Sequence, residues 1–267
     1  MYRSLLYVPA HSERFVSKAH ERGADAIILD LEDAVPESDK DAARARLAEI
    51  VPRVRQCGAA ALVRINAGPR FTDDAHAAAR AGADGIVVPK ADAVLLASLA
   101  PLGPPLIATL EDPAAVLDAR ASARLDAVVA LMVGGEDLAT ALNAQPTPEV
   151  LRLPKLLVHY AAKAEGKQSF GLFRSVADYA DLEGIRLAAR EARTHGFDGA
   201  ACIHPSAVPI LNEAFSPSEQ DIEWARRVTA AAMLTPGAFV LDGRMVDRPI
   251  IDRARRVLVQ STARPAS

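Results

Sequence analysis

Residues 20–33, HERGADAIILDLED, carry the pattern that decides the fold of this 267-residue chain. Gly23 stands where a helix would end, an apolar run follows at 26–31, and acidic side chains close that run. Glycine commonly follows the last turn of a helix because it adopts the left-handed conformation without strain. An unbroken apolar run is typical of a strand that is buried on both faces of a parallel sheet. The stretch therefore predicts a helix, a turn and a buried strand.

The same succession recurs at residues 79–90 and 194–204, where Gly82 and Gly196 take the place of Gly23. Eight apolar runs are found in all, at residues 4–8, 26–31, 61–65, 85–89, 106–110, 127–133, 169–172 and 200–203. Segments rich in Ala, Arg and Glu lie between them with apolar residues at helical spacing, as at 13–22, 39–56 and 182–195. Eight buried strands that alternate with helices indicate an α/β fold, a closed (β/α)8 TIM barrel. A doubly wound open sheet is the alternative.

The chain continues well beyond the last predicted strand. An extra helical stretch at 142–166 follows the sixth strand, and the barrel is complete near Pro205. Two helices are expected beyond it, around 217–233 and 249–259, with a patch of mixed apolar and polar residues at 238–246 between them. We therefore predict a barrel catalytic domain at residues 1–208. Residues 209–267 would form a C-terminal helical extension that packs as a lid on a neighbouring subunit.

Composition excludes several classes of protein. Half of the residues are hydrophobic, 24% are charged, and the net charge is −3, so a basic surface for nucleic acid is not expected. Two cysteines, Cys57 and Cys202, are too few for a disulfide scaffold or a cysteine-based zinc site. No apolar run reaches the ~18 residues of a membrane span, and the first residues lack the features of a signal peptide. We expect a cytoplasmic protein without a membrane partner.

Polar side chains close six of the eight predicted strands. Active sites of TIM barrels lie at this end of the strands, and polar groups there are costly to bury unless they bind something. Glu111 and Asp137 end two neighbouring strands, and two carboxylates with waters and substrate oxygens are typical of a Mg²⁺ site. The alternative is a buried ionic network of the carboxylates with Arg64 and Lys90. The polar strand ends are Asp30, Glu32, Asp33, Arg64, Asn66, Lys90, Glu111, Asp112, Glu136, Asp137 and His204.

Arg64 is the strongest candidate for binding an anion, because a guanidinium can hold a carboxylate through two hydrogen bonds. The alternative is a structural salt bridge from Arg64 to Glu32 or Asp33. Lys90 fits either role, and a lone His204 is more typical of a structural group than of a ligand. No nucleotide-binding glycine motif follows the first strand.

Six motifs in order resemble those of one family, the citrate lyase beta subunit-like proteins of the HpcH/HpaI aldolase and malyl-CoA lyase superfamily. The motifs are LYVPA at 6–10, LDLEDAV at 29–35, VRIN at 63–66, VPK at 88–90, GEDL at 135–138 and CIHPS at 202–206. The resemblance covers residues 2 to about 260. It implies a barrel with a C-terminal extension, a homotrimer, and Mg²⁺-dependent cleavage or formation of a carbon–carbon bond in a 3-hydroxyacyl thioester.

The resemblance also implies roles for individual residues. Glu111 and Asp137 fall on the metal ligands, and Arg64 and Glu111 fall at the substrate. Arg64, Glu32 and Asp247 are the candidate catalytic residues, with Asp247 presented to the site of a neighbouring subunit. Two further candidates for substrate binding, at the thioester carrier, are Arg14 and Lys18.

The sequence departs from the family pattern after Glu111, where Asp112 replaces the usual Thr or Ser. The extra acid beside the metal position would alter how the substrate carboxylate is held. The sequence leaves the acyl group open among citryl, citramalyl and malyl, and the carrier open between coenzyme A and acyl carrier protein. Two other functions remain as alternatives. One is a class II-type aldolase on free 2-oxo acids, and the other is a non-catalytic subunit of a lyase complex.

Overall fold

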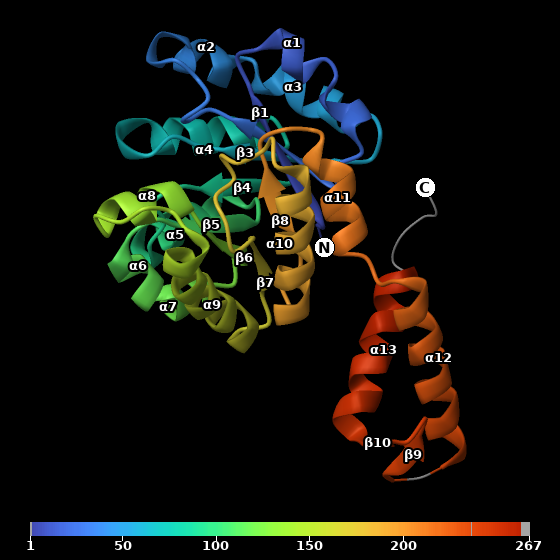
Figure 1. The fold of residues 1–267 in the computed structure, drawn as a ribbon. Coiled ribbons are helices and arrows are strands. Elements are labelled where there is room, and N and C mark those ends of the chain that lie inside the picture. The colour runs from blue at the N-terminus through green and yellow to red at the C-terminus, as the bar shows by residue number, and fades with distance from the viewer. Residues whose placement is uncertain (1, 236, 263–267) are drawn as a thin grey trace. The chain divides into compact units, whose positions relative to one another are not determined.

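Eight parallel strands form one sheet in the computed structural model, which describes residues 2–235 and 237–262 (Figure 1). The strands lie in the order β7-β6-β5-β4-β3-β2-β1-β8, so β1 to β7 are paired in sequence order and β1 is also paired with β8. The strands are β1 Ser4–Pro9, β2 Ala26–Asp30, β3 Ala60–Arg64, β4 Gly85–Val88, β5 Leu106–Leu110, β6 Val128–Val133, β7 Gln168–Phe170 and β8 Ala200–Cys202.

The sheet closes almost completely between β7 and β8. A single parallel bridge joins Phe170 to Gly199. It is supported by hydrogen bonds from Gly171 N to Gly199 O at 2.9 Å and from Asp198 N to Ser169 O at 3.0 Å. An open doubly wound sheet would leave two unpaired edges, so the prediction of a TIM barrel is confirmed.

Helices cover the outside of the barrel (Figure 1). The predicted helix at 182–195 is α10, whereas those at 13–22 and 39–56 are each divided into two pieces. At the joint in the second, Arg46 N donates to both Ala42 O and Ala43 O, so the turn tightens there. The first unit contains α1 Glu13–Val16, η1 Ala19–Arg22, η2 Glu37–Asp39, α2 Lys40–Ala45, α3 Leu47–Val54, η3 Gly68–Arg70, α4 Phe71–Arg80, α5 Ala93–Leu99, η4 Ala100–Leu102, α6 Pro113–Leu117, α7 Ala119–Ala123, α8 Gly135–Ala141, α9 Pro148–Ala164, α10 Leu182–His195 and most of α11 Ala207–Ala214.

The interior of the barrel is filled with apolar side chains. They come from successive strands and form one core cluster, because side chains at every second position of a strand point to the same face. The polar side chains that line the mouth of the barrel lie at or near the C-terminal ends of the strands. The cluster consists of Leu5, Ala26, Ile28, Leu62, Val87, Ile107, Ala130, Met132 and Phe170.

The chain divides into two compact units, Met1–Glu213 and Ala214–Ser267. In the second unit, α12 Glu219–Leu234 and α13 Arg248–Thr262 pack on each other and on a hairpin of β9 Phe239–Leu241 and β10 Arg244–Val246. The predicted mixed patch at 238–246 is thus a β-hairpin. Packing of this extension on a neighbouring subunit stays a prediction. Among the described residues, no helix is long and apolar enough to cross a membrane.

Candidate active site

A cavity of about 410 Å³ lies at the C-terminal ends of the barrel strands. Polar side chains from several strands line it, as expected for the mouth of a TIM barrel. Thr109 and Glu111 illustrate why these polar groups meet there. Thr109 lies in β5 and Glu111 directly follows the strand, two positions later, so both side chains face the interior above Ile107. The polar lining includes Asp30, Arg64, Thr109, Glu111, Glu136 and Asp137.

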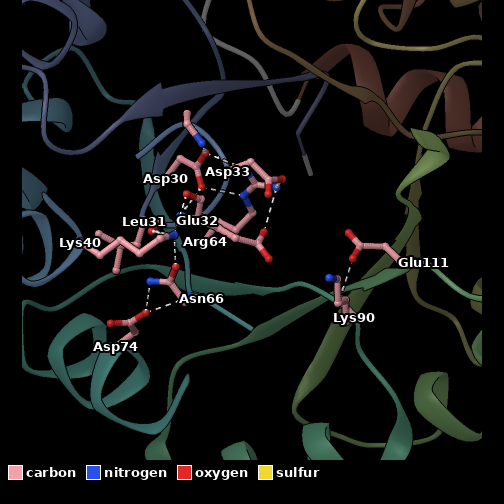
Figure 2. A network of polar contacts seen from close by, with 11 residues as sticks. Asp30, Leu31, Glu32, Asp33, Lys40, Arg64, Asn66, Asp74, Lys90 and Glu111 are labelled. Carbon is pink, nitrogen blue, oxygen red and sulfur yellow. Dashed lines mark hydrogen bonds and ion pairs between the residues drawn. The ribbon is translucent and has the colours of Figure 1, made fainter. Parts of the chain in front are cut away.

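Arg64 ends β3 at the centre of an acidic cluster (Figure 2). Its Nε and Nη2 each lie 2.6 Å from a different oxygen of Asp30, which makes a two-pronged ion pair. Its Nη1 lies 3.0 Å from Glu32 and 2.9 Å from Asp33. The guanidinium carbon lies 4.9 Å from the ring centroid of Tyr7, so the group is stacked as well as paired. Arg64 therefore makes the predicted salt bridges to Glu32 and Asp33, and it also lines the cavity.

The acid that holds Arg64 is itself held by the backbone. Asp30 is only 1% exposed, and its two oxygens also accept hydrogen bonds from Glu32 N and Ala34 N. These contacts and the two from Arg64 satisfy both oxygens of the buried carboxylate. The loop after β2 is therefore fixed around the guanidinium.

A second polar chain supports this loop from outside the cavity (Figure 2). The Nζ of Lys40 donates to the carbonyls of Leu31 at 3.2 Å and Glu32 at 2.9 Å, and also to Asn66 Oδ1. Asn66 donates through its N and Nδ2 to Oδ2 of the buried Asp74. Asn66 is therefore a support for the β2 loop.

Glu111 and Asp137 form the acidic pair on the other side of the cavity. Glu111 is buried, and its Oε2 accepts a hydrogen bond from Lys90 N at 3.0 Å. Lys90 has a φ of 47°, a strained left-handed conformation that presents this amide to the carboxylate. Burial, and next the nearby Asp137, raise the pKa of Glu111 to about 7. A Cβ at Gly134 would lie 2.5 Å from Glu111 Cγ, so any larger residue there would displace the Glu111 side chain.

The donor set of this pair fits a Mg²⁺ ion. Mg²⁺ binds through one or two carboxylates and keeps several waters or substrate oxygens. Within the described ranges, no group of three or more His, Cys, Asp or Glu side chains could hold a metal on its own. Two carboxylates whose repulsion raises a pKa would be relieved by a cation between them. Glu111 and Asp137 thus remain the proposed ligands.

Burial also raises the pKa of Glu32, to about 8. Arg64 acts in the opposite sense, while Asp33, Glu111 and Asp30 raise the pKa further. A cation that entered the cavity would lower the pKa of Glu32 again. A carboxyl group that exchanges a proton near neutrality is suited to acid–base work.

Lys155 of α9 is a cavity residue that the sequence did not reveal. Its side chain is 5% exposed, and its Nζ donates to Leu172 O at 2.6 Å and to Arg174 O at 3.0 Å. Burial lowers its pKa to about 8. Ser175, in the same loop, bonds to Glu136 beside Asp137. A lysine within a helix carries no signal of this role, because only the barrel brings α9 next to the loop after β7.

A second cavity of about 660 Å³ contains the two predicted carrier residues, Arg14 and Lys18. Arg22 and His204 line it as well, so its wall is basic. It adjoins the first cavity, since Tyr7, Pro9 and Ile203 line both. His204 hydrogen-bonds Ser206 Oγ at 2.7 Å through Nδ1, and its ring stacks on Tyr179.

Asp247 belongs to the second unit, directly before α13. Its Oδ1 accepts a hydrogen bond from Ile250 N at 3.5 Å, the position of an N-cap. This contact accounts for an acid at the start of the helix without any catalytic role. The predicted catalytic role of Asp247 stays a prediction.

Comparisons with known proteins give closely agreeing results. A model of the family HpcH/HpaI aldolase/citrate lyase matches residues 3–99 and 101–205. A citrate lyase subunit beta-like protein of Mycobacterium tuberculosis is 35% identical over 264 residues, which cover 95% of this chain and 93% of that protein. A (3S)-malyl-CoA thioesterase of Cereibacter sphaeroides is 35% identical over 275 residues, which cover 98% of this chain and 95% of that protein.

Solved structures resemble the whole chain. The crystal structure of the protein CitE from Mycobacterium tuberculosis in complex with magnesium, acetoacetate and coenzyme A has a TM-score of 0.82 and 33% sequence identity. The match covers 97% of each chain.

Proposed function

Because this chain belongs to the HpcH/HpaI aldolase/citrate lyase family, we propose that it is a Mg²⁺-dependent carbon–carbon lyase that acts on a 3-hydroxyacyl thioester of coenzyme A. The observation that supports this most directly is the pairing of Glu111 and Asp137 opposite Arg64 in one cavity at the barrel mouth. A non-catalytic subunit would have no need of two nearby carboxylates, of which Asp137 raises the pKa of Glu111.

The reaction breaks the bond between C2 and C3 of the acyl group. The C3 hydroxyl loses its proton, its oxygen becomes the carbonyl of a 2-oxo acid, and the electron pair of the broken bond moves onto the thioester as an enolate. The enolate carbon then takes up a proton. An enzyme must therefore accept one proton, stabilise negative charge and return one proton.

The residues of the cavity divide these tasks. Mg²⁺, when bound by Glu111 and Asp137, supplies a Lewis acid that withdraws charge from substrate oxygens. Arg64 holds a carboxylate or a developing oxyanion, since its charge is fixed in place by Asp30 and by stacking on Tyr7. Glu32, with its raised pKa, holds or releases a proton beside that guanidinium.

The adjoining basic cavity is proposed to hold the carrier. Arg14 and Lys18 supply positive charge for the phosphates of coenzyme A, and the two cavities share Tyr7, Pro9 and Ile203. A thioester can therefore reach from one cavity into the other. Coenzyme A is favoured over acyl carrier protein because a related CitE structure contains it.

The oligomer remains part of the proposal. We expect a homotrimer in which the extension of one subunit covers the site of the next, so that Asp247 returns a proton to the enolate. The hairpin that precedes Asp247 carries Val240 and Met245, which are 72% and 63% exposed. Exposed apolar side chains of this kind are typical of a surface that another subunit covers.

The proposed function is tested by incubating the protein with Mg²⁺ and citryl-, citramalyl- or malyl-CoA and identifying the products. A lyase releases acetyl-CoA together with oxaloacetate, pyruvate or glyoxylate, respectively. The Glu111→Gln variant should retain its fold but lose at least about 10- to 100-fold in turnover, because even the loss of a partner that only orients a metal ligand costs that much.

A thioesterase is the second candidate, because one relative with 35% identity carries that name. Hydrolysis would release free coenzyme A and the intact hydroxy acid, without any 2-oxo acid. Free coenzyme A as the first product from all three thioesters would contradict the lyase proposal.

A further inference from the structure

Tyr7 holds Arg64 through its ring, but its hydroxyl group has no role in the proposed function. The residue lies in β1, is partly exposed above the apolar core cluster and lines both cavities. In the part of the chain that the structure describes, no hydrogen bond engages this hydroxyl, and it is not among the buried polar atoms that lack a partner. The hydroxyl is therefore open to a ligand and free to donate.

Tyr7 stands where the two cavities meet. Three side chains line both of them, those of Tyr7, Pro9 and Ile203. The pairing of Leu6 with Cys202 between β1 and β8 brings Tyr7 next to Ile203, the residue that follows β8. Pro9 and Ile203 have apolar side chains. Among the described residues that the two cavities share, the polar side-chain group is thus the hydroxyl of Tyr7.

The junction of the cavities corresponds to one point of the substrate. The carrier is proposed to occupy one cavity and the acyl group the other, so the thioester that joins them lies between the two. When the bond between C2 and C3 breaks, its electron pair moves onto the thioester, and negative charge gathers on the carbonyl oxygen. A donor at this point stabilises the enolate more than the neutral thioester and therefore accelerates the reaction.

The surroundings of Tyr7 suit its hydroxyl to this task. The guanidinium carbon of Arg64 lies 4.9 Å from the ring centroid, which fixes the ring and places a positive charge beside it. Burial raises the pKa of Tyr7, so the hydroxyl keeps its proton at neutral pH. Arg64 acts on this pKa in the opposite sense, which makes the hydroxyl a stronger donor.

We propose that Tyr7 is a further catalytic residue, whose hydroxyl donates a hydrogen bond to the carbonyl oxygen of the thioester and stabilises the enolate that forms there. The hydroxyl keeps its proton throughout, so the proton transfers stay with other groups. The inference rests on the proposed lyase function and adds to it the group that serves the carrier side of the broken bond.

Tyr7→Phe tests the proposal, because it removes only the hydroxyl and keeps the ring on which Arg64 stacks. With Mg²⁺ and the thioester that the wild-type protein cleaves, kcat should fall by roughly 100-fold, as expected for the loss of one donor to an oxyanion. KM, the affinity for free coenzyme A and the melting temperature should change little, because the hydroxyl acts mainly on the enolate.

A spectroscopic readout that needs no turnover accompanies the kinetics. Acetyl-CoA labelled with a heavy isotope at its carbonyl carbon is bound to each protein without any 2-oxo acid, and its carbonyl stretch is recorded by infrared difference spectroscopy. The stretch should lie at a lower frequency on the wild-type protein than on Tyr7→Phe, because a hydrogen bond to the oxygen weakens the carbonyl bond.

Tyr2→Phe is the matched control. Tyr2 precedes the same strand at the opposite end of the barrel, where its ring packs on the core cluster and on Phe170. This variant should leave kcat and the carbonyl frequency unchanged. An unchanged kcat of Tyr7→Phe, the same carbonyl frequency on wild type and Tyr7→Phe, or a loss of coenzyme A affinity that accounts for the lost activity would each overturn the inference. If the wild-type protein releases no 2-oxo acid from any thioester, the proposed function fails, and the carbonyl frequency still tests the contact.

Discussion

Arg64 shows how one side chain serves both the fold and the site. Its two contacts with Asp30 at 2.6 Å and its stacking on Tyr7 restrict the guanidinium to one plane. Asp30 needs this partner, since it is almost fully buried. A planar group that is fixed before the substrate arrives loses little entropy when it binds a carboxylate. The ion pairs therefore support the proposed binding role rather than replace it.

Replacing Arg64 by Lys is predicted to impair catalysis more than stability. Lysine keeps the positive charge beside Asp30 but cannot make the two-pronged contact. We expect kcat/KM to fall by about 10- to 150-fold, the loss of about 1.5–3 kcal/mol from one charge-assisted hydrogen bond. Steady-state kinetics alongside the melting temperature measure the two effects. A variant with unchanged kcat/KM and a lower melting temperature would show that Arg64 is purely structural.

At the scale of elements, α9 holds the loop after β7 in place. Lys155 of α9 binds two carbonyls of that loop, and Ser175 of the loop contacts Glu136 at the start of α8. The loop closes one side of the cavity. A buried amine with carbonyl partners is less well solvated than in water, which is why burial lowers the pKa of Lys155 to about 8.

This shift predicts an unusual dependence of stability on pH. Between pH 8 and 10.5 the unfolded chain holds a proton on Lys155 that the folded chain has lost. The free energy of unfolding therefore rises with pH in this window, by at most about 3 kcal/mol, and the contribution is absent below pH 8. Urea unfolding of wild type and Lys155→Met at several pH values isolates the effect. Parallel curves for the two proteins would contradict it.

At the scale of the whole molecule, the chain consists of two compact units with separate cores. The barrel unit contains both cavities. The second unit contains Asp247, which caps α13 through Ile250 N. Because Asp247 has this structural contact, a test of its catalytic role must keep the cap. Asparagine does so, since it caps helices as well as aspartate does but cannot donate a proton as an acid.

Mixing two inactive variants tests the shared site. Asp247→Asn and Glu111→Gln should each be nearly inactive, and co-refolded mixtures should regain about one quarter of wild-type activity. That fraction of sites in a cyclic trimer draws an intact Glu111 from one subunit and an intact Asp247 from the next. Mass photometry checks the trimer and subunit exchange. A monomeric protein, or no recovery after verified exchange, would contradict the shared site.

The order of elements and the location of the candidate cavity followed from the sequence. Eight apolar runs and glycine helix ends reflect local physics, because each strand is buried on both faces and each turn needs a left-handed residue. The predicted strand ends agree with β1 to β8 to within two residues. Polar residues at those ends predicted the cavity, since the C-terminal ends of all barrel strands meet at one mouth. The family motifs added the proposal that Glu111 and Asp137 hold the metal.

Only the tertiary structure decided which groups surround those residues. Lys155, Thr109 and Tyr7 come from a helix and two strands that are distant in sequence, and each looks like an ordinary core or surface residue by itself. Barrel closure brings them to one cavity and buries them there, and burial sets the pKa values of Glu111 and Lys155. The sequence by itself determined where the polar groups lie along each strand. Their burial and their partners depend on contacts between distant segments, and those contacts exist only after the barrel has formed.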